Sequence, residues 1–307
     1  MAQLIKLEDY ISRYEWNVYR YPSQFIRMKQ DNWKKLHDMW LDEEMMEETV
    51  PDKPVSAFSK WKSFLTLGSR KMESEMPDEE NALPKTENDL KHYFLDQLFP
   101  IQLKWASSTV TDVSFSDKNY DENDQLKYFL QRFPDTYLVM YYPIFNIKKA
   151  PVDGEIILIS PIGIEIIHII EKTAGAIITA DNERTWLVKE KNKQESKMLS
   201  PMLALKRTEQ IIKSILNLEN IEYPIKKVVL SRENPITFHG EPYNTKLIGK
   251  HEYEHWFGEK RQLVSPLKSQ QLKIAELLLK NCQTTSVKRP EWEADDDLTF
   301  SANNGEN

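Results

Sequence analysis

The feature that most constrains the fold is a pair of apolar segments between residues 151 and 172, PVDGEIILISPIGIEIIHIIEK. Short isoleucine-rich runs bounded by turn residues are typical of buried strands, and the Pro-Ile-Gly sequence at 161–163 supplies a turn between them. Asp153 stands at the head of the first run, and Glu165 and His168 lie in the second. Neighbouring strands that bear such residues can hold a catalytic metal ion, or they can form the buried middle of a sheet.

Composition excludes several classes of protein. The chain has 307 residues, of which 40% are hydrophobic and 29% charged, so it can bury a sizeable core. Only eight glycines are present, and the sequence has no glycine-rich phosphate loop of the GxGxxG or GxxxxGK[ST] kind. Cys282 is the sole cysteine, which excludes internal disulfides and cysteine-based zinc sites. Without a signal-peptide pattern or a run of about 18 apolar residues, we expect a cytoplasmic protein with no membrane partner.

The pattern along the chain predicts five regions. Aromatic residues at helical spacing predict a helical segment from residue 5 onward. Its basic residues and the acidic block that follows are interpreted first as a solvated helical face beside a solvated linker; the alternative is a basic arm that contacts phosphate or an acidic partner surface. The prolines that follow indicate a linker, and the chain ends in an acidic tail. The predicted regions are an N-terminal helical region (1–47), a linker with a short aromatic segment (48–86), an α/β domain (87–265), a C-terminal helix (266–285) and a disordered acidic tail (286–307).

Within the α/β domain, helices and strands alternate irregularly. A helix that runs up to Pro100 and a helix over 121–133 precede the strand TYLVMYYPIF and the Ile-rich hairpin, and a β pair over 175–190 follows. SPMLALKRTEQIIKSILNL is an amphipathic helix with Ser200 as its N-cap, and KKVVLSRE is a buried strand. This order predicts an α/β fold with a mixed sheet flanked by helices.

Residues 122–233 resemble the nuclease-related domain (NERD) family of the PD-(D/E)xK restriction-endonuclease-like superfamily. The resemblance rests on ENDQLKYFLQRFPDTYLVMYYPIF, on VDGEIILISPIGIEIIHIIEKTAG and on SPMLALKRTEQIIKSIL, which occur in the family's order. It implies a restriction-endonuclease-like core with an N-terminal helical extension. In this family an Asp and a Glu-x-Lys pair on neighbouring strands hold Mg²⁺ or Mn²⁺ and activate water.

The resemblance aligns Asp153 with the metal-binding Asp and Glu122 with the early helical Glu. With Gly163 aligned, however, the family's Glu falls on His168 and its Lys on Ile170. The Asn and Gln of its Asn-Pro-x-x-Gln motif fall on Ser200 and Ala204. Isoleucine cannot polarise water, so the Glu-x-Lys motif is degenerate.

Three substitute residues are open from the sequence. A one-residue bulge would bring Glu165 to the face of His168 as a metal ligand, and Lys172 shares that face four residues along. Glu155 lies two residues from Asp153 on the same face as a candidate second carboxylate, although a solvated residue at the start of the strand is the preferred interpretation.

HEYEH at 251–255 matches the H-E-x-x-H pattern, in which two histidines bind zinc and the Glu is a general base. Glu276 would be a third ligand beside His251 and His255. Gly249 lies just before this segment and Gly258 just after it, whereas the zinc-binding helix of a metallopeptidase is long and buried. An exposed, charged helical turn is therefore the preferred interpretation.

The leading functional hypothesis is a catalytically degenerate NERD-like module that binds DNA, RNA or a protein and needs no cofactor. The alternative is a divergent nuclease that uses Mg²⁺ or Mn²⁺ through Asp153, Glu122 and either Glu165 or His168. The third is a zinc metallopeptidase at residues 251–255.

Overall fold

The computed structural model describes residues 1–47, 84–148, 150–181, 184–190 and 194–289. The chain divides into two compact units, one of Met1–Pro22 with Ile101–Asn307 and one of Ser23–Pro100. The predicted N-terminal region thus falls into both units. Most of the predicted linker lies outside the described residues.

The Ser23–Pro100 unit contains most of helix α2 (Tyr21–Glu47) and the first part of helix α4 (Glu87–Trp105). The Trp33 and Phe94 ring centroids are 5.3 Å apart, and Trp40 Nε1 donates a hydrogen bond to the Pro84 carbonyl at 2.7 Å. Pro100 lies inside α4, so the helix runs past the proline at which the sequence predicted its end.

A six-stranded mixed sheet forms the centre of the larger unit, in the order β1-β3-β6-β7-β11-β13. β3, β6 and β7 are antiparallel neighbours, whereas the pairs β1–β3, β7–β11 and β11–β13 are parallel. The strands are β1 (Gln3–Leu7), β3 (Leu138–Tyr141), β6 (Ile156–Ser160), β7 (Gly163–Ile169), β11 (Ile225–Leu230) and β13 (Thr245–Ile248).

The Ile-rich segment forms the predicted hairpin. Ser160 pairs with Gly163 across a two-residue turn, and the register continues without a shift to Ile156 and Ile167. All five residues of β6 are buried, as expected for a central strand that is covered on both faces.

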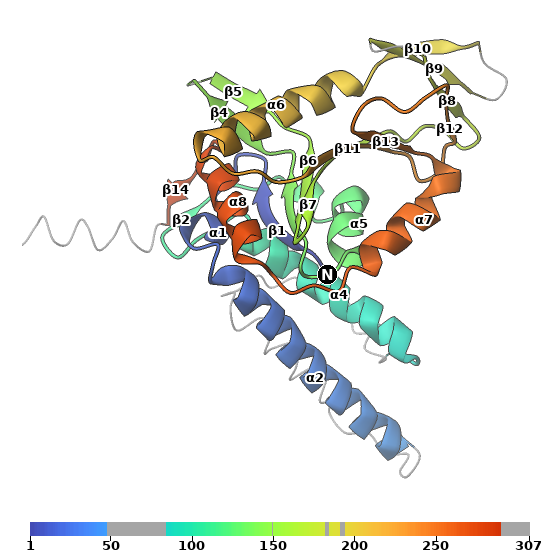
Figure 1. Cartoon of the computed structure of the whole chain (residues 1–307). Helices are drawn as coiled ribbons and strands as arrows, with labels where there is room; N and C mark the ends of the chain where they lie inside the picture. Colours follow the sequence, from blue (N-terminus) through green and yellow to red (C-terminus); the bar gives the residue numbers. More distant parts are fainter. Residues whose placement is uncertain (48–83, 149, 182–183, 191–193, 290–307) are drawn as a thin grey trace, which may run out of the picture. The chain divides into compact units, whose positions relative to one another are not determined.

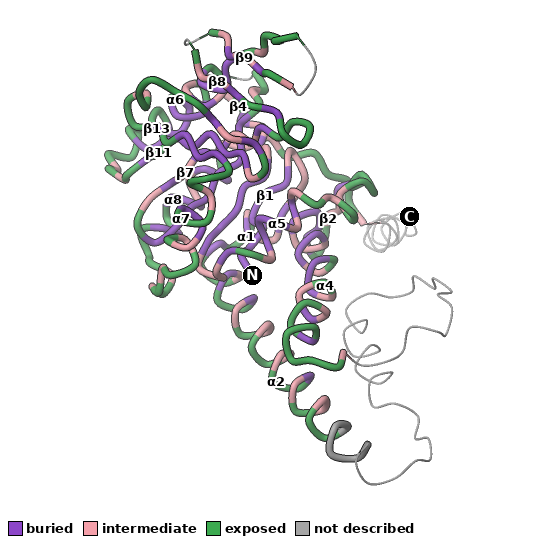
Figure 2. The backbone as a smooth tube through the Cα atoms, turned by 90° about the vertical axis from the view of Figure 1, so that its right-hand side faces the viewer, coloured by how far each residue is buried: buried purple, intermediate pink, exposed green. Residues whose placement is uncertain are grey.

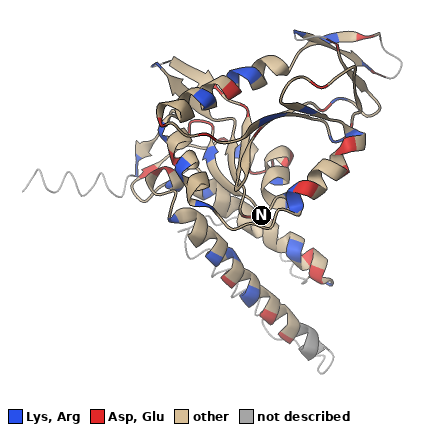
Figure 3. Cartoon of the chain, viewed as in Figure 1, with Lys and Arg blue, Asp and Glu red and all other residues tan. Residues whose placement is uncertain are grey.

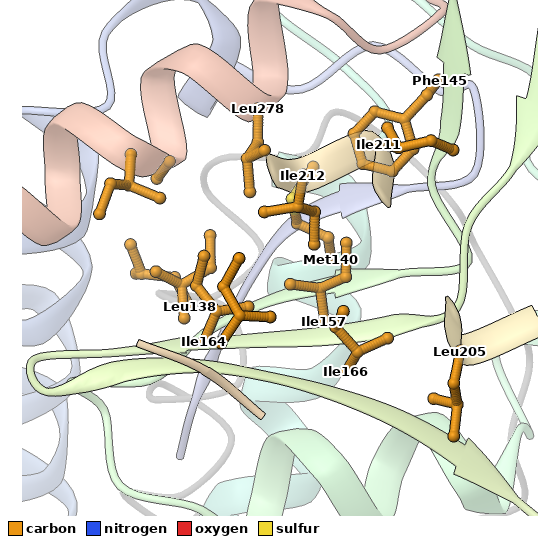
Figure 4. Packing of buried hydrophobic residues seen from close by; sticks show 14 of the residues in the cluster. Leu138, Met140, Phe145, Ile157, Ile164, Ile166, Leu205, Ile211, Ile212 and Leu278 are labelled. Carbon is orange, nitrogen blue, oxygen red and sulfur yellow. The ribbon is translucent and has the colours of Figure 1, made fainter. Parts of the chain in front are cut away.

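Helices cover both faces of this sheet (Figure 1). Figure 4 shows one side, where strand residues such as Met140 and Ile166 pack against Leu205 and Ile212 of one helix and Leu278 of another. These two helices are α6 (Met202–Leu218) and α8 (Ser269–Lys280); the opposite layer contains α5 (Asp124–Arg132) and α7 (Lys250–Arg261). Aromatic residues join the second pair, with the Phe133 and Phe257 centroids 5.6 Å apart.

Smaller elements complete the unit. A four-stranded sheet has the order β10-β9-β8-β12, and two two-stranded sheets pair β4 with β5 and β2 with β14. The bounds are α1 (Arg13–Trp16), β2 (Asp112–Val113), a 3-10 helix (Lys118–Tyr120), β4 (Ile144–Ile147), β5 (Ala150–Asp153), β8 (Ile177–Ala180), β9 (Thr185–Lys189), β10 (Ser196–Leu199), β12 (Ile236–Phe238) and β14 (Val287–Lys288).

The predicted α/β class with a mixed, helix-flanked sheet is confirmed, but both termini differ from the prediction. The first residues form β1, a fully buried strand of the central sheet, where the sequence predicted helix. The predicted disordered tail begins with β14, which pairs with β2, while residues 290–307 lie outside the described part. In both places long-range strand pairing overrides the local pattern.

The outer edge of β1 is closed by one side chain. Gln102, at the carboxyl end of α4, accepts a hydrogen bond from the Leu4 amide at 3.0 Å and donates one to the Ala2 carbonyl at 2.8 Å. Gln102, Leu4 and Ala2 are fully buried. The amide therefore takes the place of a further strand at this edge.

We expect Gln102→Leu to lower the free energy of unfolding by about 2–4 kcal/mol, because it leaves two buried backbone groups without partners. Denaturant unfolding measures the change. Gln210→Leu, at an exposed position of α6, is the matched control and should change stability by less than about 0.5 kcal/mol. Equal stability of the two variants would show that the edge does not depend on Gln102.

Candidate functional site

Glu155 directly precedes β6, and continuing the β6–β7 register by one residue beyond Ile156 and Ile167 places it opposite His168. Glu155 Oε2 lies 3.0 Å from His168 Nδ1, and the two side chains are 9% and 29% exposed. Cross-strand partners project from the same face of a sheet, so this carboxylate and imidazole form a pair fixed by strand register. The position that the resemblance gives to a metal-binding Glu is thus occupied by a histidine held by a carboxylate.

One hydrogen bond to α6 holds the backbone of Glu155 in place. Its backbone amide donates to Thr208 Oγ1 of α6 at 3.1 Å. Tyr142, just after β3, adopts a left-handed backbone with φ 46°, a strained conformation for a bulky residue. Burial raises the pKa of the Tyr142 hydroxyl; the hydrogen bond from Gln125 lowers it, and the charge of Glu155 raises it.

Asp153 lies apart from this pair. It ends β5, pairs with Ile144 of β4 and is exposed. Gly154 separates it from Glu155 at a close approach, because a Cβ there would come within 2.9 Å of both the Phe145 ring and the Pro143 carbonyl. Asp153 therefore belongs to the β4–β5 hairpin, whereas Glu155 directly precedes β6 of the central sheet.

Glu165 points to the opposite face of β7. It forms an ion pair with Lys260 of α7, and its second oxygen is buried without a hydrogen-bond partner among the described residues. The β6–β7 and β7–β11 registers are both regular through this region, so the bulge that would turn Glu165 towards His168 does not occur.

The other predicted residues lie around the same end of the sheet. Glu122 is exposed beside Asn123, whose side chain caps α5 and accepts a hydrogen bond from Tyr141 at the end of β3. Lys172 follows β7, with its backbone amide bound by Asn234 at 2.8 Å and its side chain exposed.

No metal-ligand cluster forms from these residues. In the ranges that the structure describes, no group of three or more His, Cys, Asp or Glu side chains is arranged to hold a metal ion. Ile170, at the position of the family's Lys, is 4% exposed and lies in the hydrophobic core. What the site offers is therefore an imidazole oriented by one largely buried carboxylate.

The HEYEH segment forms part of α7, as the exposed helical turn that the sequence favoured. His251 and His255 are both exposed, and His255 lies 3.6 Å from Glu259. Glu276 of α8 is instead engaged with Lys280 at 2.9 Å and with the Tyr19 hydroxyl at 3.1 Å. The three predicted zinc ligands do not converge.

The basic residues predicted for the N-terminal region are distributed along α2, where acidic residues are interspersed among them (Figure 3). Arg27 and Lys34 are exposed, and so are Asp31 and Asp38. Among the described residues, no helix combines the length and apolar character needed to cross a membrane.

Comparison with known proteins gives a partial relative. No family model matches the sequence, and no solved structure matches it. An RNA 2',3'-cyclic phosphodiesterase from Geobacillus stearothermophilus is 37% identical over 117 residues, which cover 33% of this chain and 36% of the relative. The chain thus spans little more than a third of that relative's length, and most of the relative lies outside the match.

Glu155 orients His168 by accepting a hydrogen bond from Nδ1, so the neutral imidazole should carry its proton on Nδ1. We expect Glu155→Ala to shift the ring to the Nε2–H tautomer that is usual for free imidazole. ¹⁵N-detected NMR of the imidazoles, at a pH where they are neutral, distinguishes the two forms. Exposed His239 is the internal control and should not change; an Nε2–H tautomer of His168 in the wild type would contradict this geometry.

Cys282 is protected by its environment. Burial raises the pKa of its thiol to about 12, and the Sγ–H group donates to the Leu278 carbonyl at 3.3 Å. Because the thiolate is the nucleophile, a disulfide reagent should react with native protein only slowly up to about pH 9. The same reagent should titrate one thiol per chain rapidly in denaturant. Rapid labelling of the folded protein would show that Cys282 is accessible.

Proposed function

We propose that this chain is a nuclease-related nucleic-acid-binding module whose restriction-endonuclease-like core has lost metal-dependent cleavage. The order of elements supports the resemblance. α5 and β3 come first, the β6–β7 hairpin follows, and α6 leads into β11, which pairs parallel with β7. These are the segments, in sequence order, on which the similarity to the NERD family rests.

The pairing of His168 with Glu155 is the observation that carries the loss of cleavage. Metal-dependent phosphodiester hydrolysis needs converging carboxylates and a group that polarises water. In this chain the imidazole occupies the Glu position, and a buried isoleucine occupies the Lys position. Asp153 projects from a separate hairpin. Such a site can still hold a phosphate through its imidazole without providing the ligands of a nuclease.

RNA is the favoured nucleic acid. The relative that shares 117 residues is named as an RNA 2',3'-cyclic phosphodiesterase, and a histidine oriented by a carboxylate is a common general base in metal-free hydrolysis. Hydrolysis of a terminal cyclic phosphate at His168 is therefore the second candidate. Because almost two thirds of the relative is unmatched, its named activity can also reside outside the shared segment.

A single panel tests these functions. The full chain is titrated into labelled single-stranded RNA, single-stranded DNA, duplex DNA and RNA ending in a 2',3'-cyclic phosphate. Each substrate is then incubated with Mg²⁺, Mn²⁺ or EDTA. We expect binding that weakens with salt, strongest for RNA, and no product under any condition.

Other outcomes overturn the proposal in distinct ways. Metal-dependent cutting that disappears in Asp153→Ala would establish a divergent nuclease. Opening of the cyclic phosphate in EDTA, lost in His168→Ala, would establish the second candidate. Absence of binding by folded protein would overturn nucleic-acid recognition and direct the search to a protein partner, with α2 as the first surface to test.

A further inference from the structure

The four-stranded sheet presents one face to the core and one to solvent. Ile178, Trp186 and Ile236 point inward and belong to the main hydrophobic cluster. Strand residues alternate between the two faces, so their neighbours in sequence point outward. Figure 1 shows this sheet beyond the end of the central sheet, and Figure 2 shows how much of it is exposed.

The outer face is basic, although the whole chain carries a net charge of −7. Lys189 and Lys197 are the only charged residues in the four strands β8, β9, β10 and β12, and both are exposed. Neither has a partner among the residues that the structure describes. Acidic residues occur only in the flanking turns, at positions such as Asp181 and Glu195.

Strand register brings these lysines together. Lys197 of β10 lies opposite Leu187 of β9, and Lys189 is two residues further along β9 on the same face. Diagonal neighbours of this kind are roughly 7–8 Å apart, which is comparable to the spacing of successive phosphates in an extended nucleic-acid strand.

Neutral groups complete the surface. Thr179 and Thr237 lie side by side, with their hydroxyl oxygens 3.0 Å apart, and the Thr237 hydroxyl donates to the Ile178 carbonyl at 3.3 Å, so this pair is bonded within the sheet and adds no charge to the face. Leu199 and Ile177 are 70% and 40% exposed and offer apolar contact to sugars. The outward positions of the four strands carry no aromatic residue, so the face provides no platform for base stacking.

We propose that this outer face binds the phosphate backbone of a single nucleic-acid strand, with Lys189 and Lys197 contacting successive phosphates. The inference rests on the proposed nucleic-acid-binding function and assigns it a surface separate from the His168–Glu155 pair. Recognition through phosphates without base stacking is insensitive to sequence and sensitive to salt.

The test compares the wild type with Lys189→Gln/Lys197→Gln in binding to single-stranded RNA of mixed sequence. Each phosphate contact contributes about 0.7 to the slope of log affinity against log salt concentration for a single strand. We expect the double variant to reduce that slope by about 1.4. Its affinity at low salt should fall roughly tenfold, equally for different sequences.

Lys226→Gln/Lys246→Gln is the matched control, because it removes the same charge from exposed positions on β11 and β13. It should keep the wild-type slope. Circular dichroism and the Tm verify that both double variants are folded. If the wild type binds and all three proteins give equal slopes, the assignment of phosphate binding to this face is wrong, while the proposed function stands. Failure of the wild type to bind would overturn both.

Discussion

The central sheet is covered by helices on both faces, so charged side chains that enter those layers must find partners inside the protein. An unpaired buried charge costs several kcal/mol, whereas a paired and hydrogen-bonded one is tolerated. Lys6 of β1 is fully buried and donates to Glu15, Thr284 and the Tyr10 carbonyl. Lys227 of β11 is buried against Glu209 of α6. These contacts tie distant segments of the chain to the sheet.

The same constraint governs the residues that suggested catalysis. Glu165 enters the α7 layer and is neutralised by Lys260, while His168 enters the α6 layer and is paired with Glu155. A carboxylate committed to a lysine or an imidazole in this way is a poor candidate for a metal ligand. The pairs fix helices and strands relative to one another, which is sufficient reason for charged residues to occupy the middle of an isoleucine-rich sheet.

Sequence reasoning succeeded where local pattern and burial agree. The hairpin, the amphipathic helix α6 and the buried strand β11 follow from apolar periodicity and turn residues. β1 was predicted as helix because its place depends on pairing with β3, more than 130 residues away. Glu155 was expected in solvent, yet counting residues back from the two-residue turn at Pro161 would have placed it opposite His168. The position of Glu155 thus follows from the strand register and not from the composition of the segment.

The division between buried and exposed charge also indicates where a polyanion can bind. A phosphate gains little from Lys6 or Lys227, since both side chains are buried and paired with a carboxylate inside the protein. Lys189 and Lys197 stand on a solvent-facing sheet with no described partner, so binding a phosphate there breaks no existing contact. Under the proposed function, nucleic acid would therefore bind through this face and independently of the His168–Glu155 pair. Cleavage and binding then depend on different residues, and each can be lost without the other.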